Sequence, residues 1–141
     1  MCNIKNSEVI RHILETLLSI SSRKTTQGYA LLTMNGLITK LQEKYNFLKH
    51  VEIKDTRFVE LDNPIGVMTD INSVKSDDVG RALYDIIKLM NDALGESAGY
   101  FFIKELRNNI AENYYTIIEE MGLDLGLMQL ELEVSEMTKK L

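Results

Sequence analysis

The sequence has few of the residues that cross-link a fold or interrupt its secondary structure. Among its 141 residues it has one cysteine, Cys2, one proline, Pro64, and no tryptophan. A single cysteine excludes an intrachain disulfide and a four-cysteine zinc site. No window reaches the roughly 18 consecutive apolar residues of a membrane span, and no basic segment followed by an apolar one indicates a secretory leader. We therefore expect a cytoplasmic protein that does not associate with membranes.

Catalytic motifs are also lacking. The chain contains no G-x-G-x-x-G, G-x-x-x-x-G-K-[ST] or G-x-S-x-G pattern. Its two histidines, His12 and His50, have no partners at metal-ligand spacing. The segment that begins at Asp70 looks like a calcium-binding loop, but it has Lys75 at the position where such a loop needs glycine. We expect no catalytic residues, cofactor or metal. An enzyme of unrecognised type stays open as a third hypothesis, and it requires a histidine in a cleft beside carboxylates.

Positive charge is scarce in the second part of the chain. Residues 1–50 carry seven Lys/Arg against three Asp/Glu, a balance of +4, and residues 51–141 carry nine against eighteen, a balance of −9. Because nucleic-acid binding usually needs a strongly basic footprint, we expect no nucleic-acid partner. One interpretation is that the basic residues 1–50 lie against the acidic residues 51–141, within one chain or between two chains. The alternative is that the charged residues of both parts face solvent.

What is present is an ordinary globular composition, with 45% hydrophobic and 26% charged residues. A chain of this length buries one core, so we expect a single domain over 1–141. Apolar residues at spacings of three and four predict a helical pair over 7–46 and C-terminal helices over 77–139. The individual helices are expected over 7–20, 29–45, 76–94, 97–121 and 123–139.

Between the two helical parts the pattern changes. Val51 and Ile53 alternate with charged residues, and a turn signal at Pro64 precedes Ile65, which predicts an antiparallel hairpin over 50–69. The predicted fold class is therefore mostly α with a small antiparallel β-hairpin (α+β), a helical bundle-like single domain. Gly95 and Gly122 are interpreted as residues that end helices, with close helix approach through Gly95-x-x-x-Gly99 and Gly122-x-x-x-Gly126 as the alternative.

Two segments have competing patterns. Asn35-Gly36 is a hairpin signal, yet Leu37 to Tyr45 is rich in good helix formers, which favours one helix over 29–45. The tail over 123–139 alternates like a strand around Leu132 but also has a heptad spacing, and its Leu, Met, Gln and Glu favour a helix. The heptad positions form the candidate face of a homodimer: Leu123, Leu127, Leu130, Val134 and Met137.

An aromatic cluster interleaved with cations lies just before this tail. Adjacent aromatic residues cannot all face one core, so some should approach a partner, a neighbouring helix or a pocket. The alternative function is therefore a small-ligand-binding domain with an aromatic pocket and a cationic rim. The candidate ligand or partner surface consists of Tyr100, Phe101, Lys104, Arg107, Tyr114 and Tyr115.

Four stretches carry a resemblance to a known group: GYFFIKEL from Gly99, YYTIIEEMGLDLGLMQLE from Tyr114, RKTT from Arg23 and LQEKYNFLKHVEIKD from Leu41. Together they make the chain similar to small archaeal output-type domains associated with two-component signal transduction. The resemblance implies a regulatory, interaction-type role and carries over no active-site residue. Our leading hypothesis is a non-enzymatic cytoplasmic signalling or regulatory module that acts through protein–protein contacts, as a homodimer, with a possible signalling protein as partner.

Overall fold

The computed structural model describes residues 4–53, 65–94 and 102–139, with side chains up to residue 134 in the last range. These residues form six α-helices and one two-stranded antiparallel sheet, which confirms the predicted mostly-α fold with a small hairpin. The α-helices are α1 (Asn6–Lys24), α2 (Gln27–Leu41), α3 (Ser76–Leu94), α4 (Phe102–Asn109), α5 (Glu112–Glu120) and α6 (Leu125–Lys139). Between α2 and α3 lie a 3-10 helix η1 (Asn46–His50), β1 (Val51–Ile53), β2 (Ile65–Val67) and a second 3-10 helix η2 (Thr69–Ser73).

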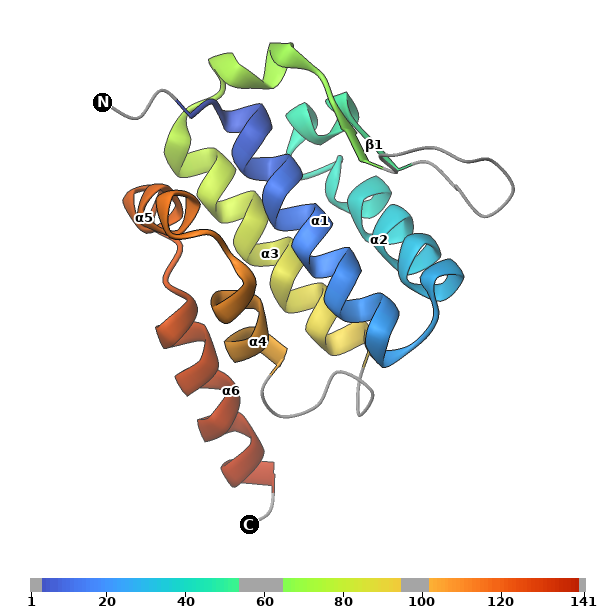
Figure 1. Cartoon of the computed structure of the whole chain (residues 1–141), viewed down its shortest axis with the longest axis vertical. Helices are drawn as coiled ribbons and strands as arrows, with labels where there is room; N and C mark the ends of the chain where they lie inside the picture. Colours follow the sequence, from blue (N-terminus) through green and yellow to red (C-terminus); the bar gives the residue numbers. More distant parts are fainter. Residues whose placement is uncertain (1–3, 54–64, 95–101, 140–141) are drawn as a thin grey trace.

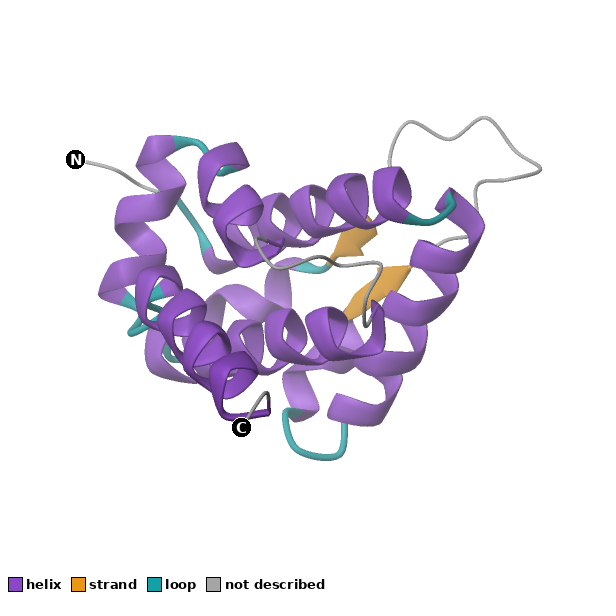
Figure 2. Cartoon of the chain, turned by 90° about the horizontal axis from the view of Figure 1, so that it is seen from below, coloured by secondary structure: helices purple, strands orange, loops and turns teal. Residues whose placement is uncertain are grey.

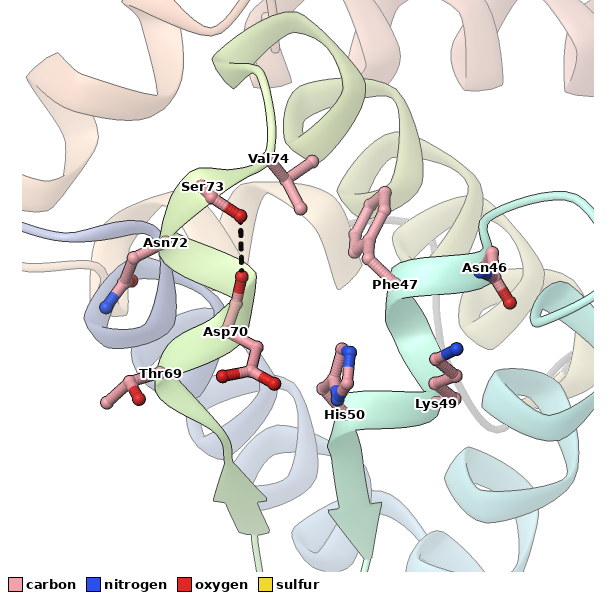
Figure 3. A pocket seen from close by; sticks show the side chains of 9 residues that line it. All are labelled: Asn46, Phe47, Lys49, His50, Thr69, Asp70, Asn72, Ser73 and Val74. Atoms are coloured by element: carbon pink, nitrogen blue, oxygen red, sulfur yellow. Dashed lines mark hydrogen bonds between the residues drawn. The ribbon is translucent and has the colours of Figure 1, made fainter.

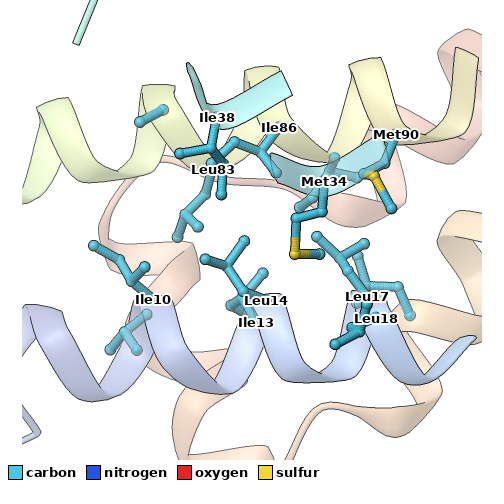
Figure 4. Close-up of a cluster of buried hydrophobic side chains, with 14 of the residues drawn as sticks. Ile10, Ile13, Leu14, Leu17, Leu18, Met34, Ile38, Leu83, Ile86 and Met90 are labelled. Carbon is cyan, nitrogen blue, oxygen red and sulfur yellow. The ribbon is translucent and has the colours of Figure 1, made fainter. Parts of the chain in front are cut away.

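The core is built around α1, which contacts α2, α3, α4, α5, β2 and η2. Its apolar residues recur at spacings of three and four, so they form one continuous stripe that is buried along its whole length. Figure 4 shows this stripe facing the buried side chains of α3, with Met34 and Ile38 of α2 completing the layer. Burial of these aliphatic side chains is the main stabilising term of the fold.

The first two helices differ from their predicted bounds. α1 continues to Lys24 because Ile20 and Ser21 are buried. α2 starts at Gln27, earlier than predicted, directly after Thr26, whose hydroxyl accepts the backbone N–H of Tyr29 at 3.1 Å. α2 passes through Gly36 unbroken, as predicted, but ends at Leu41. Its expected last turn is wrong, because the chain leaves the helix and Tyr45 turns toward α3.

The two strands pair with Val51 opposite Val67 and Ile53 opposite Ile65. Val51, Ile65 and Val67 are buried against α1 and α2, which supplies the packing that an isolated hairpin lacks. The predicted turn around Pro64 lies outside the described residues. Figures 1 and 2 both place the strands on the side of the molecule away from α6.

The single helix predicted up to Met121 is wrong, because the structure divides it into α4 and α5. Asn108 and Asn109 are poor helix formers, Ile110 is buried, and Ala111 has extended backbone angles before α5 begins. The break lets α4 and α5 each lay an apolar side on α1. Among the described ranges, no helix combines the length and apolar character that a membrane crossing requires.

Candidate interaction surface

The turn before α6 is a Schellman motif that fixes where this helix starts. Gly122 follows α5 with φ of +91°, a left-handed conformation that glycine adopts without strain. Its N–H donates to the carbonyl of Glu119, and the N–H of Leu123 donates to the carbonyl of Ile118, both at 3.0 Å. Asp124 then caps the start of α6, since its Oδ1 accepts the N–H of Leu127 at 3.0 Å.

One face of α6 packs against the rest of the chain. Leu125 and Met128 are buried, Leu132 is half-buried, and the helix contacts α4 more than any other element. A pocket of about 200 Å³ lies between this face, α3 and Ile103 of α4. α6 is therefore an edge helix, held mainly from one side, and Figure 1 shows its C-terminal end running away from the core helices.

The opposite face of α6 is also apolar. Leu127, Leu130 and Val134 are 51%, 55% and 54% exposed, and they repeat at spacings of three and four. At about 100° per residue, their mean direction is roughly opposite to that of Leu125, Met128 and Leu132. We call Leu127, Leu130 and Val134 the outward stripe. An amphipathic helix of a closed domain has one apolar face, so the second, half-exposed face of α6 exceeds what packing in the domain requires.

Two members of the predicted dimer face do not join the described stripe. Leu123 is only 1% exposed, because it follows the Schellman turn and packs inward before α6 begins. Its inclusion in an outward dimer face is therefore wrong. Met137 continues the spacing within the α6 backbone, but its side chain lies outside the described residues. The prediction that the tail is helical is confirmed.

The surface around the outward stripe is acidic. Residues 108–138 contain seven Asp/Glu and no Lys, Arg or His. Glu131 lies on one side of the stripe and accepts the hydroxyl of Tyr84 of α3 at 3.1 Å, and Glu133 lies on the other side and accepts the amide of Gln129 at 3.2 Å. Within the described part of α5 and α6, no carboxylate has a cation within 4 Å.

The aromatic cluster is only partly brought together. Tyr100 and Phe101 lie outside the described residues. Arg107 donates to the hydroxyl of Tyr115 at 3.2 Å and lies 5.0 Å from the centre of its ring. This hydrogen bond to Tyr115 is the main cause that raises the pKa of Arg107, and attraction to Glu119 acts in the same direction.

Of the other two members, Tyr114 contacts a different element. Tyr114 stacks on His12 of α1, with ring centres 4.2 Å apart and planes at 17°. Lys104 is exposed on α4. Tyr114 and Tyr115 are therefore already engaged by side chains of the chain itself. The small-ligand pocket stays a prediction.

His12 serves as a structural acceptor. Its Nε2 accepts the N–H of Ala111 at 3.2 Å, the backbone group that precedes α5. An acceptor nitrogen requires the neutral imidazole, and partial burial lowers the pKa of His12, which favours the same form. The sequence shows no sign of this contact, because the two residues are 99 positions apart.

His50 lines an open pocket of about 810 Å³ between η1 and η2, together with Asp70 and Lys49. Figure 3 shows the side chains of His50 and Asp70 on the two sides of this opening. The described residues include no hydrogen bond that joins His50 to Asp70 or to a hydroxyl, and no cluster of three metal-binding side chains. The pocket thus brings a histidine and a carboxylate near each other without a built catalytic pair.

Sequence analysis missed a second polar cluster, on the outer side of α3. Asp85 Oδ2 accepts Lys44 Nζ at 2.9 Å and the Tyr45 hydroxyl at 2.7 Å. The hydrogen bond from Lys44 to Asp85 raises the pKa of Lys44. A separation of 40 residues leaves no local signal for these contacts. Together with Lys24–Glu105 at 2.8 Å, they place cations of residues 1–50 on carboxylates of the acidic part.

Comparisons of the chain with protein-family models, with curated proteins and with solved structures give no match in any of the three.

Proposed function

We propose that this chain is a non-enzymatic signalling or regulatory module of the cytoplasm that acts through protein–protein contacts, with the outward stripe of α6 as its contact surface. The observation that carries the proposal is the apolar character of α6 on two opposite faces, of which one packs in the domain and the other is half exposed. Exposed apolar side chains at helical spacing are typical of helix-mediated recognition.

The polar clusters support this choice over catalysis. His12 is occupied by a ring stack and a backbone hydrogen bond, which hold the start of α5. The carboxylate of Asp85 is likewise occupied by two donors from the chain itself. His12 and Asp85 are thus engaged by other groups of the fold, whereas the side chains of the outward stripe are half exposed.

Two forms of this proposal differ in the partner. One is the predicted homodimer through α6, and the other is a contact with a different protein, such as a signalling partner. Both require the outward stripe, so substitution of Leu127, Leu130 and Val134 by serine should abolish either complex. Because all three side chains are about half exposed, the variant should stay folded.

The test combines sedimentation with comparative capture. The wild type, the triple serine variant and a control, Leu32→Ser, are each used as bait in a lysate of the source cells, after their mass in solution is measured. Leu32 is 73% exposed on α2, so the control removes a leucine elsewhere that is more exposed than those of the stripe. We expect a dimer or a captured protein that the triple variant loses and the control keeps. Complexes unaffected by the triple variant would contradict the proposal.

A further inference from the structure

We propose that the partner of the outward stripe is a basic amphipathic helix of another protein, not a second copy of this chain. This inference rests on the proposed function and adds the chemistry of the partner. Its basis is the charge that surrounds the stripe. The stripe runs between Glu131 and Glu133, and the turn before α6 adds Asp124.

Self-pairing brings like charges together. In a two-fold dimer the same patch of both copies meets itself. Glu131 and Glu133 flank the stripe and Asp124 precedes it, while the one cation of α6, Lys139, is its last residue, so two outward stripes in contact would place acidic flanks beside acidic flanks. Like charges brought together in an interface cost binding free energy and so disfavour such a partner. The acidic flanks of the outward stripe therefore disfavour pairing of two copies through it.

A basic amphipathic helix would match both the apolar outward stripe and the acidic residues beside it. Its apolar positions would cover Leu127, Leu130 and Val134, and its flanking Lys or Arg would lie beside Glu131 and Glu133. α6 has 15 residues, about 22 Å of helix, and its described stripe has three side chains, a size typical of short helix contacts rather than obligate dimers. The cations that the flanks of the outward stripe lack would come from the partner.

The two flanking carboxylates are available for such contacts. Glu131 and Glu133 accept hydrogen bonds from neutral donors, the Tyr84 hydroxyl and the Gln129 amide. Neither bond neutralises the carboxylate, and each leaves further lone pairs on its oxygens. The charge on both sides of the stripe thus faces solvent unpaired by any cation of the described residues.

The experiment uses three synthetic helical peptides of about 20 residues. The first has leucines at the a and d heptad positions and lysines beside them, the second has the same leucines with glutamates, and the third is the lysine peptide with its leucines scattered. Binding of each labelled peptide to the full chain is measured by fluorescence anisotropy at two salt concentrations. We expect the first peptide to bind about tenfold more tightly than the other two, with the advantage over the second decreasing at high salt.

Matched variants assign the effect to the stripe and to its flanks. Leu130→Ser with Val134→Ser should abolish binding of the first peptide, and Leu32→Ser should leave it unchanged. Glu131→Gln with Glu133→Gln keeps the hydrogen-bond acceptors but removes both charges, and it should cost about threefold to tenfold in affinity for the first peptide alone.

Contrary outcomes separate this inference from the proposed function. Equal binding of the lysine and glutamate peptides, equal binding of the scattered peptide, or no binding would each overturn the basic partner. A dimer of the full chain that Leu130→Ser with Val134→Ser dissolves would also overturn it, while supporting the contact role of α6. Peptide binding or dimerisation that ignores the stripe variant would contradict both.

Discussion

Helices α3 and α6 use their apolar residues in opposite ways. α3 buries a single apolar face, which includes Leu83, Ile86 and Met90, and shows solvent polar and charged residues such as Arg81 and Lys88. α6 buries Leu125 and Met128 and shows solvent a second apolar face. Since both helices lie in one small domain, the difference separates the apolar residues that the fold buries from those that it leaves half exposed.

The largest expected effect comes from the same substitution in the two helices. Leu83→Ala in α3 should lower the free energy of unfolding by about 2–5 kcal/mol, because it leaves a cavity in the core. Leu130→Ala in α6 should change it by less than about 0.5 kcal/mol, because that side chain is half exposed. Urea denaturation of both variants measures the difference. A large loss from Leu130→Ala would mean that the outward stripe belongs to the fold.

Two glycines, one in α3 and one in α2, show how closely the backbone of α3 is packed compared with that of an exposed helix position. A Cβ at Gly80 would contact the carbonyl group of Met121 well inside van der Waals distance, whereas one at Gly36 of α2 would meet nothing within 4 Å. Gly80→Ala should destabilise the protein by about 2–4 kcal/mol, since α3 and the end of α5 must separate. Gly36→Ala should stabilise it by about 0.5–1 kcal/mol as an exposed helix position. Thermal unfolding of the two variants measures the loss of stability expected for Gly80→Ala and the gain expected for Gly36→Ala.

A smaller effect is expected on the polar side of α3. Tyr45→Phe removes the hydroxyl that donates to Asp85 and leaves Lys44 in place. The free energy of unfolding should fall by about 0.5–1.5 kcal/mol. Urea denaturation measures this change in the free energy of unfolding, and Tyr29→Phe, at an exposed tyrosine of α2, is the control. An unchanged midpoint would show that the outer face of α3 is not held by this contact.

The smallest effect concerns pH and His12. Burial lowers the pKa of folded His12 below its ordinary value of 6.5, so the unfolded chain binds the proton more readily. The contribution of His12 to stability is therefore complete above about pH 6.5 and is lost as the pH falls through the lowered pKa. Protonation also removes the acceptor for the Ala111 N–H.

The variant His12→Phe keeps an aromatic ring beside Tyr114 but has no titrating group. We expect wild type to lose more stability than this variant between pH 7.5 and 5, as measured by urea denaturation at each pH. Carboxylate titration is common to both proteins, so the difference reports His12. Identical pH profiles would contradict the structural role of its neutral ring.

Local spacing was enough to predict most of the fold. The stripes of α1 and α3 are one-sided, so periodicity alone identified both helices and their buried faces. It failed at α4 and α5 because the apolar spacing continues through Ile110, where two asparagines and a contact from α1 interrupt the helix. Long-range polar contacts such as Asp85 with Tyr45 left no pattern to detect.

The candidate surface was predicted less completely. The heptad spacing found Leu127, Leu130 and Val134, but it could not tell that Leu123 turns inward, since α6 is apolar on two sides and only packing decides which side is covered. The aromatic cluster was predicted as one surface, yet Tyr114 and Tyr115 contact different elements.

Amide hydrogen exchange, followed by mass spectrometry with and without the lysine-flanked leucine peptide, tests the central claim most directly. If the outward stripe of α6 is the contact surface, added protection should appear over residues 125–134 and should vanish in the Leu130→Ser, Val134→Ser variant. Protection confined to other helices, or protection of α6 that survives this variant, would contradict the account.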